Sequence, residues 1–201
     1  MLAKKEKKFA IILTFFTLLT ILVKLKIFYN FEVSIVKLIP KFQGLTLTLM
    51  FLITNLADFF VTLVIIGCFT IYDLILTGRV NRLTLKLFLA FLLVTILTLT
   101  FKILVGIEKP KNMLTSIPNI LNLTKEYSYP SGHVARFTVL TCYIHERWNR
   151  KFAATVLLIL VSLTRLTLHA HYPTDLVGGV LLGLLVYLTI DYFWRRRPLF
   201  S

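Results

Sequence analysis

Six long apolar runs constrain this chain more than any other feature of its sequence. Each is bounded by charged or turn-forming residues, and together they cover residues 9–29, 45–69, 83–105, 132–148, 152–169 and 175–194. Apolar runs of about 17–25 residues match the thickness of the hydrocarbon core of a bilayer. The mean hydropathy of +0.82, with only 16% charged residues, excludes a water-soluble globular fold. We predict an all-α integral membrane bundle of about six transmembrane helices, forming a single domain over residues 1–201.

The basic residues predict how this bundle is oriented. The net charge is +14, but the cations flank apolar runs, which indicates topology signals and contacts to anionic ligands rather than nucleic-acid binding. With the N-terminus inside, thirteen basic residues lie on the cytoplasmic side and nine on the outer side, of which three are assigned below to a site. Both termini are therefore expected to be cytoplasmic. The apolar stretch 9–23 of the first run follows a basic start, and Lys24 and Lys26 come after it in place of a small-residue cleavage site, which predicts a retained signal anchor.

Three polar clusters interrupt the apolar pattern, at residues 102–111, 129–133 and 164–175. Each has an ordinary interpretation by itself: lysines that reach the lipid headgroups, a plain helix N-cap, and a polar loop. The clusters that follow the third and fifth apolar runs are separated by two spans, so all three must lie on the same face of the membrane. We therefore expect them to form one site, at the ends of the helices.

The combined clusters have the composition of an oxyanion site. Their cations are Lys102, Lys109 and Arg165. Ser131 and Gly132 begin a helix whose unpaired N–H groups and dipole favour an anion. Because few carboxylates accompany these groups, a tetrahedral oxyanion such as phosphate is the expected ligand. Two histidines, His133 and His171, belong to the same clusters, so the chemistry that the site permits is phosphoryl transfer to a histidine.

These residues closely resemble the three signature motifs of the type 2 phosphatidic acid phosphatase family. The first motif is Lys102 to Lys109-Pro110, the second is Pro130-Ser131-Gly132-His133, and the third joins Thr164-Arg165 to His171 and Asp175. The family includes lipid phosphate phosphatases, polyprenyl diphosphate phosphatases and, more distantly, vanadium haloperoxidases. Two departures are visible, since Lys109 stands where the family has arginine and Thr164 where it has serine. Lysine keeps the charge but loses the planar two-donor fork.

The resemblance implies a role for each residue of the site. His171 is expected to attack phosphorus and form a phosphohistidine, His133 to protonate the leaving oxygen, and Asp175 to orient the His171 ring. The groups expected to hold the non-bridging oxygens are Lys102, Lys109, Arg165 and the amides of Ser131 and Gly132. Nearby carboxylates are limited to Asp175 and Glu108, too few for a two-metal site, so we predict no metal and no other cofactor.

Several other polar residues have two interpretations. Arg136, three residues after His133, is either a further phosphate contact or a snorkelling cation. His169 could compete with His171 as the nucleophile, but its spacing to Asp175 does not fit the family pattern, so we expect a loop-packing histidine. Asp58, one turn after Asn55 inside the second run, invites a functional hypothesis but is expected to bond a neighbouring helix. The remaining charges at the inner helix ends are read as solvated: His145, Glu146, Arg147, Asp191 and Arg195. Cys68 and Cys142 lie in apolar runs and are read as free thiols.

The leading hypothesis is a multi-pass membrane phosphatase that acts on a lipid phosphate or diphosphate, at the extracytoplasmic face of the cell membrane. A polyprenyl diphosphate of the undecaprenyl or dolichyl type is the favoured substrate, by analogy alone. The nearest rival is a phosphatidic acid or phosphatidylglycerophosphate phosphatase. Two alternatives from another class would also explain an anion pocket: a transporter and a non-catalytic lipid-phosphate-binding protein. A transporter should place its polar groups near the bilayer midplane, where only Asn55 and Asp58 fit. No oligomeric state is predicted.

Overall fold

The computed structural model describes residues 2–110 and 126–196, with the side chains of 2–5 and 195–196 left out. This part of the chain forms eight helices: α1 (Leu2–Lys24), α2 (Tyr29–Leu38), α3 (Gly44–Asn55), α4 (Phe59–Thr77), α5 (Arg82–Val105), α6 (Gly132–Trp148), α7 (Lys151–Thr167) and α8 (Pro173–Arg196). Strand pairing within it is limited to an isolated antiparallel bridge between Glu108 and Tyr127. The all-α prediction is confirmed.

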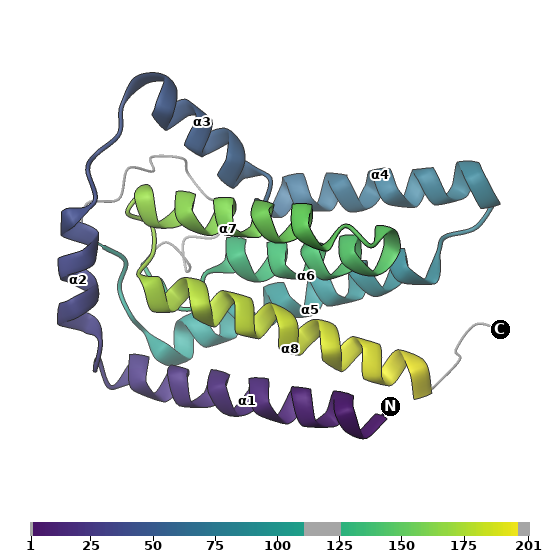
Figure 1. Ribbon diagram of the computed structural model, residues 1–201, viewed down its shortest axis with the longest axis horizontal. Helices are drawn as coiled ribbons and strands as arrows, with labels where there is room; N and C mark the ends of the chain where they lie inside the picture. Colours follow the sequence, from purple (N-terminus) through teal and green to yellow (C-terminus); the bar gives the residue numbers. More distant parts are fainter. Residues whose placement is uncertain (1, 111–125, 197–201) are drawn as a thin grey trace.

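Six of these helices form the bundle. Figure 1 shows α1, α4, α5, α6, α7 and α8 running along the long axis of the molecule, while α2 crosses one end and α3 lies tilted at that same end. By length and apolar composition α4, α5 and most of α8 can each cross a membrane, and α1 with α2 passes the same test as a pair bent by 86°. Helices α6 and α7, of 17 residues each, complete the bundle between them.

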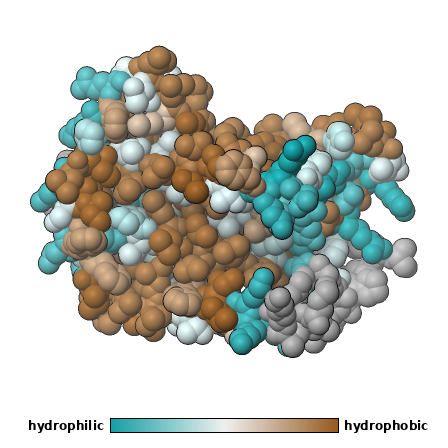
Figure 2. Space-filling view, in the orientation of Figure 1, coloured by the Kyte–Doolittle hydropathy of each residue, from teal (hydrophilic) through white to brown (hydrophobic). Residues whose placement is uncertain are grey.

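The surface has the pattern of a membrane protein. Figure 2 shows apolar residues covering the side formed by α1, α8 and α7, and hydrophilic residues gathered toward the two ends. Large apolar side chains are exposed along the bundle, among them Phe15, Ile75, Phe152 and Phe193. In water such a surface would be an aggregation site, whereas in a bilayer it faces lipid. We call the end that carries α2 and α3 the site end and the other the opposite end.

The second predicted span, 45–69, is wrong as a single helix. Helix α3 stops at Asn55, the chain turns through residues 56–58, and α4 starts at Phe59 and runs on to Thr77. Asp58 is the N-cap of α4, with extended backbone, and its Oδ1 accepts a bond of 3.0 Å from the amide of Phe60. A carboxylate that satisfies a free helix N–H stabilises a helix start, which a hydropathy pattern does not detect. Asp58 therefore begins a helix rather than lying within one.

Glycines of α8 allow the closest helix contact of the bundle. A Cβ added at Gly179 would lie 2.7 Å from the carbonyl oxygen of Ser131, and one at Gly183 would lie 2.6 Å from that of Ala135. A Cβ at Gly178 would overlap the ring of Tyr129, at 2.5 Å. Small residues let helix backbones approach in a membrane. This contact holds the start of α6 directly against the start of α8.

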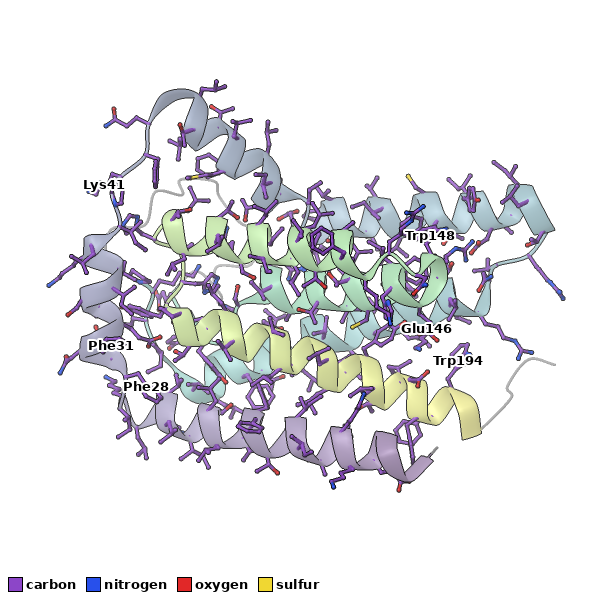
Figure 3. All side chains as sticks on the ribbon, viewed as in Figure 1. Phe28, Phe31, Lys41, Glu146, Trp148 and Trp194 are labelled. Carbon is purple, nitrogen blue, oxygen red and sulfur yellow. The ribbon has the colours of Figure 1, made fainter. Side chains whose placement is uncertain are left out.

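The opposite end contains a network of buried ion pairs. Lys86, 1% exposed, donates from Nζ to Glu146 Oε2 at 2.6 Å and to Asp191 Oδ1 at 2.8 Å. Asp73, 2% exposed, accepts a bond of 2.6 Å from Nη2 of Arg147. Figure 3 shows Glu146 at this end, far from Lys41 near the site end. The network joins α4, α5, α6 and α8.

The expectation that these inner charges are solvated is wrong for Asp191 and Arg147, while Glu146 is exposed but paired. Asp191 is 7% exposed and Glu146 is bonded by both Lys86 and the hydroxyl of Tyr187, at 2.6 Å in each case. Arg147 stacks over the rings of Tyr72, Tyr143 and Trp148 as well as pairing with Asp73. Each of these charges is stabilised by its partner, and those partners are distant in sequence. The side chain of Arg195 lies outside the described residues, as do residues 111–125 of the long polar loop.

Candidate active site

The first and second polar clusters are joined by the chain that connects α5 to α6. After α5 ends at Gly106, which has left-handed backbone, the amide of Ser128 donates to the carbonyl of Ile107 at 2.7 Å and that of Lys109 donates to Glu126 at 2.9 Å. Lys102, 6% exposed in the last turn of α5, donates from Nζ to the carbonyl of Tyr127 at 2.5 Å. The two lysines are thereby held beside the start of α6.

The second and third clusters meet where α6 and α8 begin. The amide of Ser131 donates to the carbonyl of Asp175 at 2.9 Å, and the hydroxyl of Ser128 donates to the carboxylate of Asp175 at 3.4 Å. The glycine contact of the two helices makes this approach possible. The expected convergence of three sequence-distant clusters at one end of the bundle is therefore what the structure shows.

His171 and Asp175 form a buried pair. Nδ1 of His171 lies 3.3 Å from Oδ2 of Asp175, and the same oxygen accepts a bond of 2.7 Å from the amide of Tyr172. His171 is 2% exposed and Asp175 is fully buried. Burial holds the pKa of His171 well below its usual value, and the charges of Arg165 and Lys102 lower it further. The ring is therefore neutral at pH 7, and an Nδ1–H tautomer donates to the carboxylate.

Arg165 approaches this pair from the last turn of α7. It is 6% exposed, its Nη1 donates to the hydroxyl of Thr54 on α3 at 3.3 Å, and its Nε is buried with no partner among the described residues. A buried guanidinium bonded to nothing more than a hydroxyl has donors left for an anion. Lys109 is half-buried, and burial together with the charge of Arg165 lowers the pKa of its amine to about 8.

His133 lies in the first turn of α6, partly exposed, and interacts electrostatically with Arg165, Lys102 and His171. The two histidines thus lie on different helices at the same end, with the cations around them. His169, by contrast, is buried in the same loop as His171 with left-handed backbone, and its Nδ1 has no partner in the described chain. This environment agrees with a packing histidine.

One detail of the predicted anion site is wrong. The amide of Ser131 is not available to a ligand, because it donates to Asp175 of α8. The unpaired N–H groups of α6 therefore start at Gly132, since the first helical amides have no intrahelical acceptor. Ser131 offers its hydroxyl instead, which is buried without a partner in the described part of the chain.

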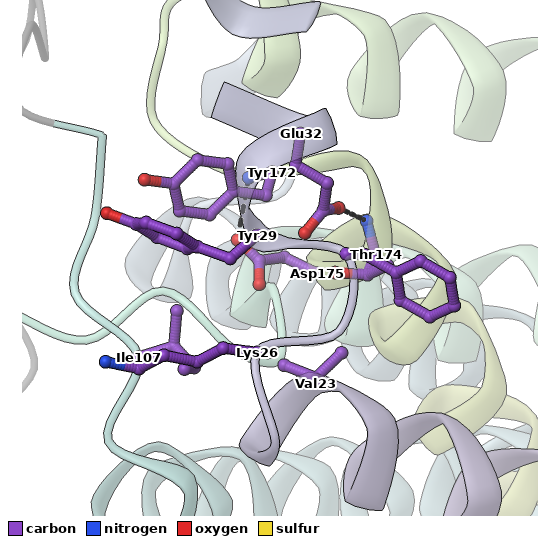
Figure 4. Close-up of a pocket in the computed structure, with 9 residues that line it drawn as sticks. Val23, Lys26, Tyr29, Glu32, Ile107, Tyr172, Thr174 and Asp175 are labelled. Carbon is purple, nitrogen blue, oxygen red and sulfur yellow. Dashed lines mark hydrogen bonds between the residues drawn. The ribbon is translucent and has the colours of Figure 1, made fainter. Parts of the chain in front are cut away.

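Two supporting residues were missed by the sequence reasoning. Ser128 bonds Asp175 from a loop, and Glu32 of α2 accepts a bond of 2.7 Å from the amide of Thr174 in the first turn of α8. Figure 4 shows Glu32 directed at Thr174, beside a pocket also lined by Tyr29, Tyr172 and Asp175. A carboxylate is favoured at a helix N-terminus, but its distance of 142 residues from Thr174 hides the contact in the sequence.

The carboxylates nearest the site, which are Asp175, Glu32 and Asp58, accept hydrogen bonds from groups other than its cations. Glu108 is exposed on the edge of the connecting loop, and Asp175 is bonded by His171, Ser128 and Tyr172. Among residues 2–110 and 126–196, no group of three or more histidine, cysteine or acidic side chains is arranged to hold a metal ion. The arrangement offers a neutral nucleophilic ring, a second histidine and several cations whose donors are incompletely used.

Comparisons with known proteins identify the fold and the family of the chain. The fold matches the crystal structure of a transmembrane PAP2 type phosphatidylglycerolphosphate phosphatase from Bacillus subtilis, with a TM-score of 0.79, 21% identity, and coverage of 94% of this chain and 96% of that one. A stretch of 81 residues is 28% identical to the putative undecaprenyl-diphosphatase YbjG of Escherichia coli, and it spans 38% of this chain and 40% of that protein. The family model of the PAP2 superfamily matches residues 83–198, more than half of the chain, so the protein belongs to the PAP2 superfamily.

Proposed function

We propose that the protein is a membrane phosphatase that hydrolyses a lipid phosphate or diphosphate through a phosphohistidine intermediate. The observation that carries the proposal is the buried His171–Asp175 pair, surrounded by cations that have few carboxylate partners. A structural ion pair does not need this surplus of positive charge, whereas a phosphoryl group that gains charge in the transition state does. Membership of the PAP2 superfamily supports the same reading.

In the first step, Nε2 of His171 attacks phosphorus while Nδ1–H remains bonded to Asp175. A nitrogen–phosphorus bond forms and the bond from phosphorus to the leaving oxygen breaks, and that oxygen takes a proton from protonated His133. Asp175 stabilises the positive charge that develops on the His171 ring, as the carboxylate of a catalytic triad does. Lys102, Lys109 and Arg165 hold the non-bridging oxygens.

In the second step, water cleaves the phosphohistidine. His133, now neutral, accepts a proton from the water as its oxygen bonds to phosphorus, and the nitrogen–phosphorus bond breaks to restore His171. Inorganic phosphate leaves, and His133 is again protonated. No metal takes part in these steps. From a diphosphate the products are phosphate and a lipid monophosphate.

Among lipids, we propose a polyprenyl diphosphate as the substrate. The site lies at helix ends, level with lipid headgroups, and a relative that matches part of the chain is named as a putative undecaprenyl-diphosphatase. Phosphatidic acid and phosphatidylglycerophosphate are the alternatives, the latter because the fold resembles a phosphatidylglycerolphosphate phosphatase. Asp58, which as a polar residue inside a span had fitted a transporter, does not lie inside a helix. It caps α4 and interacts electrostatically with Arg136 and Arg165.

The test is phosphate release by purified protein in detergent, with chelator present, from a polyprenyl diphosphate, phosphatidic acid and phosphatidylglycerophosphate. We expect His171→Ala to lower the rate by at least about a thousandfold, because it removes the nucleophile. The ranking of the substrates identifies the lipid. Binding of these lipids by the wild type without phosphate release would contradict the proposal and favour the non-catalytic alternative.

A matched control is His169→Asn. His169 lies in the same buried loop, and asparagine tolerates its left-handed backbone, so the substitution changes a neighbouring histidine without the same strain. We expect this variant to retain most of the activity. Equal losses in the two variants would mean that loop packing, rather than nucleophilic attack, explains the effect of His171→Ala.

We also propose that the site faces outward and that both termini are cytoplasmic in the cell membrane. The excess of basic residues at the opposite end supports this orientation. Because α1 begins and α8 ends at the opposite end, a reporter fused after Arg197 should be cytoplasmic. An external signal from that reporter would reverse the assigned orientation without affecting the proposed chemistry.

A further inference from the structure

Arg136 is a buried cation that the three signature motifs do not include. It lies on α6 one turn after His133 and is 9% exposed. Its Nε and Nη2 donate to the carbonyl of Ala57, at 3.3 Å and 3.2 Å. A backbone carbonyl neutralises none of the charge of a guanidinium, so this contact positions Arg136 without forming an ion pair with it.

The free end of the Arg136 guanidinium lies at the anion-binding start of α6. Nη1 would be 3.2 Å from a Cβ added at Gly132, so it packs directly against the helical turn that carries the unpaired amides. The same turn carries the buried, unpartnered hydroxyl of Ser131. Arg136 also interacts electrostatically with His133 and Lys102, which places its charge within the site.

Arg136 and Arg165 form a pair that is held by one element. The break between α3 and α4 supplies the Thr54 hydroxyl to Arg165 and the Ala57 carbonyl to Arg136. Asp58 of the same break interacts electrostatically with both guanidiniums, which also repel one another. Two buried like charges that repel one another are stabilised when an anion binds to both. The break therefore holds two anion-binding forks at the site end.

We infer that Arg136 is an additional substrate-binding residue, and that with Arg165 it forms a paired clamp that selects a lipid diphosphate over a lipid monophosphate. The inference rests on the proposed function and deepens it. Arg165 lies beside His171 and holds the phosphoryl group that is transferred. The guanidinium of Arg136 packs against Gly132, the neighbour of His133, so it lies on the side of the site where the leaving group is protonated and from which the lipid of a bound substrate extends.

This placement matches the chemistry of a diphosphate. Its leaving group is itself a phosphate, bonded to the lipid, which carries a negative charge on its own non-bridging oxygens both before and after its bridging oxygen takes the proton from His133. A guanidinium bonds such a group through two parallel N–H donors, more strongly than a neutral donor would. A monophosphate presents an alcohol oxygen at that position and has no charge there for Arg136 to bind.

The test compares farnesyl diphosphate with farnesyl monophosphate, which share one lipid and differ by a single phosphoryl group. We expect Arg136→Gln to lower kcat/KM for the diphosphate at least about tenfold more than for the monophosphate, the effect of one charge-assisted contact. Arg136→Lys, which keeps the buried charge, should show the same selectivity to a smaller extent and remains informative if Arg136→Gln does not fold. Equal losses on the two substrates, or no loss, would overturn the inference.

Thr54→Val is the matched control. It removes the hydroxyl bonded to Arg165 with little change in shape, so it should lower activity on both farnesyl substrates by the same factor, and Thr54→Ser should restore it. Inhibition by inorganic pyrophosphate and by orthophosphate gives a second reading, since Arg136→Lys should weaken pyrophosphate selectively. If the wild type hydrolyses neither farnesyl ester, the proposed function fails, while selective binding of pyrophosphate still tests the clamp directly.

Discussion

The two ends of the bundle both bury charge, but they do so in opposite ways. At the opposite end, Lys86 lies between two carboxylates and Arg147 pairs with Asp73, so each cation has an anionic partner within 2.8 Å. At the site end, Lys102 bonds backbone carbonyls and Arg165 bonds a hydroxyl. The described residues there contain four buried or half-buried cations, counting Lys109 and Arg136.

This difference distinguishes buried charges that stabilise the fold from buried charges that are available to a ligand. A buried charge with a bonded counter-charge contributes to the folded state, and removal of one partner is costly. A buried charge that lacks a counter-ion destabilises the fold and persists where a ligand supplies the missing charge. The charge balance of each end, rather than its polarity, therefore indicates which end binds substrate.

The largest expected effect on stability is at the opposite end. Lys86→Met should destabilise the protein by about 3–5 kcal/mol, because it leaves Glu146 and Asp191 facing one another without a cation. The melting temperature in detergent should fall by on the order of 10 °C. Lys86→Arg, which keeps the charge, is the control, and its melting temperature should fall less. A loss of activity in Lys86→Met without a thermal shift would contradict the structural role.

Lys102→Met is the corresponding change at the site end. We expect kcat/KM to fall by about a hundredfold or more, since Lys102 is the donor to the phosphoryl group in the mechanism that we propose. The melting temperature should stay the same or rise, because a buried cation near Lys109, Arg136 and Arg165 is removed. A fall in melting temperature as large as that of Lys86→Met would contradict the difference that we describe between the two ends.

Lys109 gives a pH-dependent test of the excess positive charge at the site end. Its pKa of about 8 is set by burial and then by Arg165, with Asp175 acting in the opposite direction. Lysine is charged below its pKa, so kcat/KM should fall as the pH rises through about 8. Lys109→Arg places a guanidinium there that stays charged at all working pH values, so the alkaline fall should move upward or disappear. An unchanged pH profile would assign the titration to another group.

The sequence alone predicted those features that depend on local spacing and on topology. The all-α class and the meeting of three clusters follow from span counting, and the pairing of His171 with Asp175 was implied by the resemblance of the third motif to the family. The break at 56–58 was missed because a hydropathy window averages over a single capping residue. The bond from Lys86 to Asp191 was missed because it joins residues 105 positions apart. The Gly179 to Gly183 spacing was an available signal for the α6–α8 contact.

The smallest expected effect concerns Glu32, the buried carboxylate of the site end that bonds no cation there. Its Oε1 accepts from the Thr174 amide, directly after Pro173, which has no N–H to donate. Glu32→Gln keeps the acceptor and should leave activity within about twofold, whereas Glu32→Ala loses a cap and should cost about 0.5–2 kcal/mol of stability. Melting curves and kcat for both variants check this.

The pair of variants also tests how the charge of the site end should be counted. If Glu32→Gln behaves like wild type, Glu32 acts as a hydrogen-bond acceptor for α8 and does not offset the surrounding cations. If Glu32→Gln is as damaging as Glu32→Ala, the negative charge itself matters, and one cation of the surplus is already neutralised before substrate binds. The surplus at the site end would then be smaller, and the ligand that it fits would carry less charge than a diphosphate.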